Sequence, residues 1–281
     1  MKIHFLLGEQ VHLQPCPTFV SAMALLADRG FTVTRGIPEA ALLCPDRLCV
    51  RHDLYVLESR SELALSVAAV LHDRGGQFLN PYPACALAQN RITAASRLAT
   101  AGVPVPRSWV TADFAMLCEL AADRPVIVKP YRSGGGVANV VAHGPDDLVG
   151  IPLREHPVLV QEWVERRGPD LQLRVIGEQV FALEREATAA ARASAELRDI
   201  ALRCGSVFGL GVYGVEIVQG RNGPVVVDFD RAPCLAEVPQ AASLLARHIE
   251  NVMGGHTVLQ RQPPALQMAP AWAGLLQGAA A

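Results

Sequence analysis

A lysine followed directly by a run of glycines suggests a phosphate-binding loop. Lys129 lies near the end of the apolar segment 125–131. The residues of the loop that follows are Ser133, Gly134, Gly135 and Gly136. Glycines let successive backbone N–H groups approach an anion closely, and a lysine adds a positive charge for its oxygens. Because the lysine precedes the glycines and no helix follows at once, the pattern differs from a Walker loop. These residues alone leave open a flexible hairpin tip with a lysine that extends to solvent.

Three carboxylates lie on a predicted hairpin near the end of the chain. Glu216 is in the apolar segment 211–219, and Asp228 and Asp230 are two residues apart in the segment 224–230. Since side chains alternate along a strand, the two aspartates share one face. Clustered carboxylates repel one another, and oxygen ligands of this kind suit Mg²⁺, which proteins often share with substrate phosphates. The alternative is an edge hairpin with a solvated acidic face.

The loop of this hairpin decides which face Glu216 occupies. A three-residue loop at 221–223 pairs Gly220 with Pro224 and places Glu216 opposite Asp228. A two-residue loop at the Asn-Gly pair instead sends Glu216 to the other face. In the first register, the three carboxylates and the glycine loop together are the minimum equipment for handling ATP.

A third feature is a strand that runs into a Trp-containing linker. The segment 157–164 ends in Glu162, Trp163 and Val164, and Asp170 follows shortly after. Such a strand end, with its apolar wall, suits the edge of an adenine, and Asp170 suits ribose hydroxyls. A core strand with a buried Trp is the commoner meaning of this pattern.

Strands and helices alternate through the first ninety residues. Strands are expected at 2–7, 31–34 and 53–59, and helices at 19–28 and 62–75. This order predicts a parallel α/β layer. The elements expected further along are a helix at 86–101, strands at 125–131, 137–142 and 157–164, a hairpin at 171–185, a helix at 194–208, the acidic hairpin at 211–230 and a helix at 240–252.

Composition excludes several classes of protein. The chain has 281 residues, 51% of them hydrophobic, and a formal net charge of −2, which argues against disorder and against a nucleic-acid binder that depends on bulk positive charge. No apolar stretch reaches the roughly 18–20 residues of a membrane span. Seven cysteines without Cys-x-x-Cys spacing fit neither a disulfide framework nor a zinc site, so a cytoplasmic protein is expected. Only Lys2 and Lys129 are lysines, and an ammonium inside an apolar run is therefore notable.

The order of these motifs resembles the ATP-grasp superfamily, and most of all its RimK-type carboxylate–amine ligases. The resemblance extends over about residues 53–252 and depends on the order and spacing of the motifs. It implies an ATP-grasp fold of mixed α/β class, α+β in its C-terminal part. The expected parts are a Rossmann-like N-terminal domain at 1–83, a central subdomain with the glycine loop at 84–160, a C-terminal subdomain with the metal site at 161–260 and a flexible tail at 261–281.

The resemblance also implies roles for residues at matching positions. Lys129 matches a lysine that contacts phosphate, and Arg91 and Arg185 match basic residues near the phosphates and the transferred phosphoryl group. The expected adenine and ribose contacts are Gln161, Glu162, Trp163, Val164 and Asp170. The expected metal ligands are Glu216, Asp228 and Asp230, where the usual pattern is acid, Glu and Asn.

Some positions depart from the family pattern. Asp230 replaces the usual Asn, and Gln172 lies where relatives often carry Arg or Lys. The segment 186–195 is short and rich in alanine, whereas relatives usually have a longer basic loop there that binds the acceptor. Asp230 adds a negative charge beside the expected triphosphate, whereas the short loop bears on the acceptor more than on the nucleotide.

The sequence therefore predicts an ATP-dependent ligase that joins a small-molecule or amino-acid carboxylate to an amine through an acyl phosphate. ATP and Mg²⁺, with Mn²⁺ as an alternative, are the expected cofactors, and a homodimer or homotetramer without nucleic-acid or membrane partners is expected. Two alternatives are a small-molecule kinase with a hydroxyl acceptor and a nucleotide-binding protein without catalytic activity.

Overall fold

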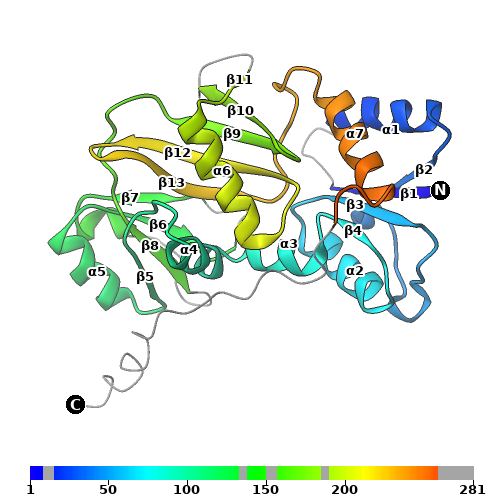
Figure 1. The fold of residues 1–281 in the computed structure, drawn as a ribbon. Helices are drawn as coiled ribbons and strands as arrows, with labels where there is room; N and C mark the ends of the chain where they lie inside the picture. Colours follow the sequence, from blue (N-terminus) through cyan, green and yellow to red (C-terminus); the bar gives the residue numbers. More distant parts are fainter. Residues whose placement is uncertain (9–15, 133–137, 150–156, 185–189, 259–281) are drawn as a thin grey trace.

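The computed structural model describes residues 1–8, 16–132, 138–149, 157–184 and 190–258. The glycine loop 133–136, Arg185 and the predicted tail lie outside these residues. The described part folds into three sheets with helices packed on them (Figure 1). No helix in this part is long and apolar enough to cross a membrane.

The N-terminal sheet is fully parallel, as the alternation of strands and helices predicts. Its strand order is β2-β1-β3-β4. Its elements are β1 (Lys2–Leu7), α1 (Pro17–Asp28), β2 (Thr32–Gly36), β3 (Leu54–Glu58), α2 (Glu62–Asp73) and β4 (Phe78–Leu79). Helix α7 (Ala241–Met253) packs against α1, so the end of the described chain returns to the N-terminal sheet (Figure 1).

One long helix was expected at 86–101, and this expectation is wrong. The structure has α3 (Tyr82–Gln89) and α4 (Arg91–Thr100), which are separated by Asn90. Asn90 has extended backbone dihedrals, and its side-chain oxygen accepts hydrogen bonds from the N–H groups of Ile92 and Thr93. An Asn at this position therefore starts a new helix instead of continuing the old one. The break places Arg91 at the first turn of α4.

A four-stranded antiparallel sheet in the order β5-β8-β6-β7 follows. Its elements are β5 (Ser108–Thr111), α5 (Phe114–Asp123), β6 (Val126–Pro130), β7 (Val140–Ala142) and β8 (Val158–Glu162). Helix α5 was not predicted, although Asp113 caps it through hydrogen bonds from the N–H groups of Ala115 and Met116. Val126 and Val128 of β6 are buried in a core with α5, so Ile127 and Lys129 face the opposite side of the sheet.

The third sheet has five strands in the order β11-β10-β9-β12-β13. Its elements are β9 (Leu171–Ile176), β10 (Gln179–Glu184), β11 (Ala191–Arg192), α6 (Ala195–Phe208), β12 (Val212–Gly220) and β13 (Gly223–Asp230). The β9–β10 hairpin turns at Gly177 and Glu178 as predicted. Helix α6 covers one face of this sheet, where Phe208, Tyr213 and Phe229 pack together (Figure 1).

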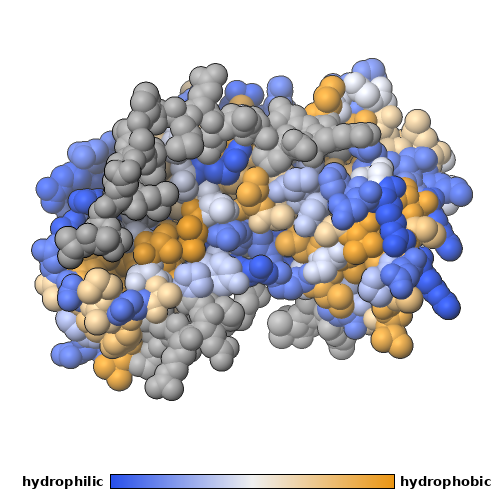
Figure 2. All heavy atoms as spheres, turned by 90° about the horizontal axis from the view of Figure 1, so that it is seen from below, coloured by the Kyte–Doolittle hydropathy of each residue, from blue (hydrophilic) through white to orange (hydrophobic). Residues whose placement is uncertain are grey.

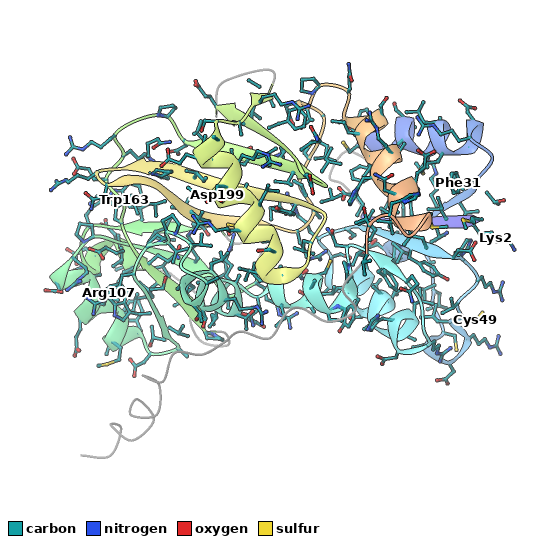
Figure 3. All side chains as sticks on the ribbon, viewed as in Figure 1. Lys2, Phe31, Cys49, Arg107, Trp163 and Asp199 are labelled. Carbon is teal, nitrogen blue, oxygen red and sulfur yellow. The ribbon has the colours of Figure 1, made fainter. Side chains whose placement is uncertain are left out.

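Two further views show the surface of the molecule and its two opposite ends. One face mixes hydrophilic and hydrophobic residues (Figure 2). Lys2, Phe31 and Cys49 lie at the N-terminal end, while Arg107 and Trp163 lie at the other end with the second and third sheets (Figure 3). The domain boundaries at 83 and 160 stay predictions.

We expect Gly205→Ala to destabilise the fold by about 2 kcal/mol, because overpacking typically costs ~1–3 kcal/mol. A Cβ at Gly205 in α6 would lie 2.1 Å from the hydroxyl oxygen of Tyr213. The gain of about 1 kcal/mol from replacing a helical glycine is smaller than this clash. Gly144→Ala is the matched control, because nothing lies within 4 Å of the added carbon. Urea unfolding measures both variants, and equal free energies of unfolding would contradict the packing described.

Candidate functional site

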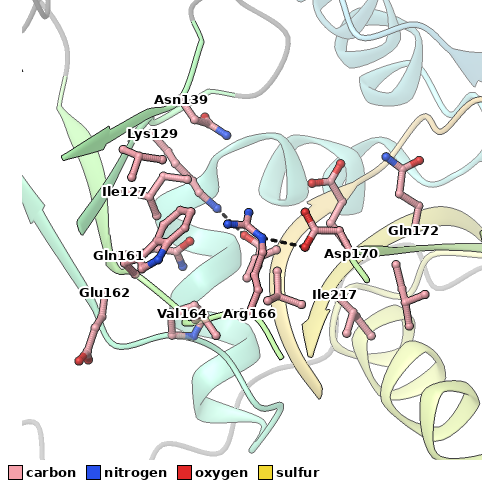
Figure 4. A pocket seen from close by; sticks show the side chains of 17 residues that line it. Ile127, Lys129, Asn139, Gln161, Glu162, Val164, Arg166, Asp170, Gln172 and Ile217 are labelled. Atoms are coloured by element: carbon pink, nitrogen blue, oxygen red, sulfur yellow. Dashed lines mark hydrogen bonds and ion pairs between the residues drawn. The ribbon is translucent and has the colours of Figure 1, made fainter. Parts of the chain in front are cut away.

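A cavity of about 320 Å³ lies between the four-stranded and five-stranded sheets (Figure 4). Lys129 and Ile127 of β6 line one side, and Glu216 and Ile217 of β12 line the other. Trp163 and Asp170, from the linker between the sheets, complete the wall. The cavity therefore combines described residues from each of the three predicted motifs, namely Lys129, Glu216 and the linker with Trp163 and Asp170.

Lys129 is buried, with a side chain that reaches the acidic hairpin. Only 2% of the residue is exposed, and its Nζ donates a hydrogen bond of 2.5 Å to the carbonyl oxygen of Val227. Burial lowers its pKa, and the positive charge of Arg91 lowers it further, while Asp228 and Glu216 act in the opposite direction. The alternative of a lysine that extends to solvent is thus wrong.

Glu216 lies opposite Asp228 in the β12–β13 ladder, in the register with all three carboxylates on one face. The loop differs from the one expected, because Gly220 pairs with Gly223 and not with Pro224. The register shifts opposite Glu216 and Ile217, where a β-bulge on β13 restores the expected pairing. Val227 is the extra residue on β13, and it is the carbonyl of this residue that Lys129 contacts. The bulge therefore both sets the face of Glu216 and presents an acceptor to the ammonium.

Glu216 is exposed, yet its surroundings raise its pKa. Partial desolvation by the protein is the first cause, and the nearby charges of Asp228 and Asp230 raise the pKa further, while Lys129 and Arg174 lower it. A cation among these oxygens would relieve the repulsion, so the donor set suits a hard divalent ion such as Mg²⁺.

Arginines already neutralise the two aspartates. Arg91 pairs with Asp228 at 2.8 Å between Nη2 and Oδ2, and Arg60, which lies between β3 and α2, pairs with Asp230. In the described ranges, no group of three or more His, Cys, Asp or Glu side chains is gathered closely enough to hold a metal ion. The predicted site at Glu216, Asp228 and Asp230 thus has the right face and chemistry without a pre-assembled cluster, and it stays a prediction.

The linker residues lie around the cavity in different ways. Arg166 extends into the cavity, stacks on the Trp163 ring at 4.4 Å from its centre and donates a 2.8 Å hydrogen bond to Asp170 (Figure 4). The carboxylate of Glu162 points away from the cavity (Figure 4). Sequence reasoning did not identify Arg166, although a basic residue between Trp163 and Asp170 is visible in the chain.

The hydrogen-bonding groups of the predicted adenine hinge are only partly available. The N–H groups of Glu162 and Trp163 donate to the carbonyls of Arg107 and Pro125. The side-chain oxygen of the buried Gln161, in contrast, has no hydrogen-bond partner within the described residues. A base edge at this wall would therefore use other groups, of which Gln161 Oε1 is one acceptor. Roles for Gln161, Glu162, Trp163, Val164 and Asp170 in nucleotide binding stay predictions.

Comparisons with known proteins identify the family and the fold of this chain. The family model for the RimK-like ATP-grasp domain matches residues 88–248. A ribosomal protein bS6–L-glutamate ligase of Escherichia coli is 25% identical over 194 residues, which are 60% of this chain and 64% of the relative. The chain thus matches slightly less than two thirds of that relative's length.

Solved structures show the same fold. A RimK-domain ATP-grasp protein of Sphaerobacter thermophilus superimposes with a TM-score of 0.75 at 22% identity and covers 89% of this chain and 100% of its own. An ATP-grasp ligase solved with a minimal precursor, Mg and ADP superimposes with a TM-score of 0.63 at 21% identity and covers 89% and 97%. The two sheets around the cavity are therefore those of an ATP-grasp fold. Because the family model matches more than half of the residues of this chain, the chain belongs to the RimK-like ATP-grasp family.

Proposed function

We propose that this protein is an ATP-dependent ligase that joins a carboxylate to an amine through an acyl phosphate and releases ADP and phosphate. The observation that carries the proposal is the buried ammonium of Lys129, which shares one cavity with Glu216 and the hairpin that bears Asp228. Opposite charges on two facing sheets suit a triphosphate with its metal ion. Membership of the RimK-like family and the name of the glutamate ligase support the same reaction.

Each charged residue has a part in the proposed reaction. Lys129 binds phosphate oxygens and offsets the negative charge that moves with the γ-phosphoryl group to the substrate carboxylate. Arg91 holds Asp228 in place from the first turn of α4. Glu216, Asp228 and Asp230 would hold Mg²⁺ or Mn²⁺, and such an ion supplies charge neutralisation for the β- and γ-phosphates. The amine then attacks the activated carbonyl and phosphate leaves.

The name of a relative suggests which amine and which carboxylate the proposed ligase would join. The name of the Escherichia coli relative makes L-glutamate the first amine to test, and it makes a protein or peptide carboxylate a candidate beside the predicted small molecules. We also propose a cytoplasmic location, which suits seven cysteines that are all free thiols in the structure.

The experiment that tests the ligase uses a pool of amino acids and peptides ending in carboxylates, with ADP release as the readout. A ligase releases ADP when both acceptors are present, and hydroxylamine in place of the amine yields a hydroxamate. A kinase instead gives a stable phosphorylated product with one substrate. The acyl phosphate would be overturned if no carboxylate that supports ADP release gave a hydroxamate with hydroxylamine.

We expect Mg-ATP to change the fluorescence of Trp163. Its ring lines the cavity and stacks on Arg166, so a bound base displaces this cation from the ring. Titration with Mg-ATP should alter emission in the wild type and in Trp109→Phe, and the change should be lost in Trp163→Phe. Trp109 is a matched control because it lies on β5 between Arg107 and Arg124 and does not line the cavity. An equal signal in both variants would contradict nucleotide binding beside Trp163.

A further inference from the structure

Two thiols from distant parts of the chain face each other beside the candidate site. Cys16 is the N-cap of α1, and Cys234 lies four residues after Asp230, in the segment that follows β13. Their Sγ atoms are 4.0 Å apart. A disulfide requires a separation of about 2.05 Å, so the two sulfurs need to approach by roughly 2 Å. Neither residue has a part in the proposed ligase reaction.

The surroundings of the two sulfurs make them unequal. The pKa of Cys16 is lowered, first by its hydrogen bond with Cys234 and also by the backbone N–H groups of Thr18 and Leu235, although burial acts against this. The same contact raises the pKa of Cys234. A cysteine at the start of a helix is commonly a thiolate, and the thiolate is the nucleophilic form. Cys234 is exposed, so the pair is open to small oxidants from that side.

We propose that Cys16 and Cys234 form a reversible disulfide, which is an oxidative modification site between the N-terminal domain and the segment after Asp230. Hydrogen peroxide is the oxidant considered. The Cys16 thiolate attacks one peroxide oxygen, the O–O bond breaks, and a sulfenic acid and hydroxide result. The sulfur of Cys234 then attacks the sulfenic sulfur, the S–O bond breaks, and water leaves with the Cys234 proton. Overall, two thiols lose two electrons and two protons, and peroxide is reduced to two waters.

The segment that carries Cys234 is tied to the candidate site. Arg174 of β9 donates a 2.8 Å hydrogen bond to the carbonyl of Cys234. Arg60 donates to the carbonyl of Ala232 at 3.2 Å and pairs with Asp230. A covalent bond at Cys234 would fix this segment relative to α1. A displacement of about 1 Å at a reacting group costs on the order of 100-fold in rate, so we expect oxidised protein to turn over at least about tenfold more slowly. This consequence rests on the proposed function, whereas formation of the disulfide does not.

The test uses the full chain with Cys44→Ser and Cys49→Ser, because these two exposed thiols would react with peroxide without bearing on the proposal. Native protein is treated with hydrogen peroxide, alkylated, digested without reduction and mapped by mass spectrometry. We expect a peptide that links Cys16 to Cys234, its loss after dithiothreitol, and its absence in Cys16→Ser and in Cys234→Ser. Because the bond closes a long loop, the oxidised protein should melt about 5 °C higher or more.

Several results would overturn the proposal. In the first, Cys16 is oxidised to sulfinic acid while Cys234 stays reduced. In the second, either thiol is linked to another cysteine. In the third, both thiols stay free although peroxide has oxidised methionines in the same sample. If the linked peptide forms but no carboxylate supports ADP release, the disulfide stands and the ligase assignment falls. If ADP release is found but no linked peptide forms, the reverse holds.

Discussion

Lys129→Met is expected to lower kcat for ADP release by about 100- to 1000-fold, which is the usual effect of removing one group that stabilises the charge of a transition state. Methionine has a similar length and suits a residue that is 2% exposed. It removes the hydrogen bond to the Val227 carbonyl and the charge that faces Glu216 and Asp228. Steady-state ADP release at saturating Mg-ATP measures the effect.

The chain offers a matched control for this variant. Lys2 is the only other lysine, and it lies at the N-terminal end of the molecule (Figure 3). Lys2→Met should keep wild-type turnover. Thermal unfolding checks that both variants are folded. Because burying an ammonium costs free energy, its removal should not lower the melting temperature. Turnover of Lys129→Met within about threefold of Lys2→Met would show that the ammonium has no role in catalysis.

Glu216→Gln is expected to lower kcat/KM for Mg-ATP at least about 100-fold and to raise stability at the same time. A metal ion contributes several kcal/mol to a phosphoryl-transfer transition state, and each 1.36 kcal/mol corresponds to about tenfold in rate. The stability effect is small, because Glu216 is exposed and solvent screens its charge. It follows from the raised pKa of Glu216, whose first cause is partial desolvation, followed by the charges of Asp228 and Asp230. Because the folded protein disfavours the charged form, this carboxylate costs stability at neutral pH, and a neutral amide does not.

The sign of this effect can be followed with pH. A raised folded pKa means that the cost is present at pH values above that pKa and absent below the unfolded value of about 4.3. The stability advantage of Glu216→Gln should therefore shrink as the pH falls toward about 4. Urea unfolding without metal at several pH values measures it, and Glu178→Gln, in the turn of the β9–β10 hairpin, is the matched control. Loss of stability in Glu216→Gln would contradict the electrostatics described.

The faces of several candidate site residues could be predicted from the sequence, because side chains alternate between the two faces of a strand. Asp228 and Asp230 must share a face whatever the loop, and the apolar alternation of 125–131 fixes Lys129 on the face opposite Val126 and Val128. The position of Glu216 could not be derived with the same certainty. The loop has one residue fewer than expected, and the bulge at Val227 compensates for it. A bulge has no signal in this run of valines, and the one contact seen at the bulged residue is made by Lys129 on another sheet.

The helix starts that were not predicted are marked by single N-cap residues, which an analysis of hydrophobic periodicity does not detect. Asn90 interrupts an apparently continuous helix, and its N-cap role is reinforced by an antiparallel bridge to Arg132. Helix α5 has an N-cap at Asp113. The pairing of Arg60 with Asp230 lies beyond any sequence pattern, since 170 residues separate them and the contact depends on how the N-terminal sheet packs. The same holds for the contact between Cys16 and Cys234.

These arginine contacts have a consequence for the metal. Arg91 and Arg60 occupy the aspartates that were predicted to bind Mg²⁺, so a metal ion with its phosphates must replace or share these partners. In the proposed complex, this exchange would couple the N-terminal sheet to the nucleotide through Arg60. The two arginine pairs also explain how three carboxylates can share one face of a folded protein, because they offset the repulsion between the negative charges.

A double-mutant cycle on the affinity for Mg-ATP tests most directly whether Lys129 and Glu216 act on one bound triphosphate. Isothermal titration calorimetry of the wild type, Lys129→Met, Glu216→Gln and the double variant gives four dissociation constants. Residues that share one ligand are coupled, typically by 0.5–3 kcal/mol, so we expect the two losses to overlap by at least about 1 kcal/mol. Four equal dissociation constants, or two losses that add within about 0.3 kcal/mol, would contradict a triphosphate held between these two side chains.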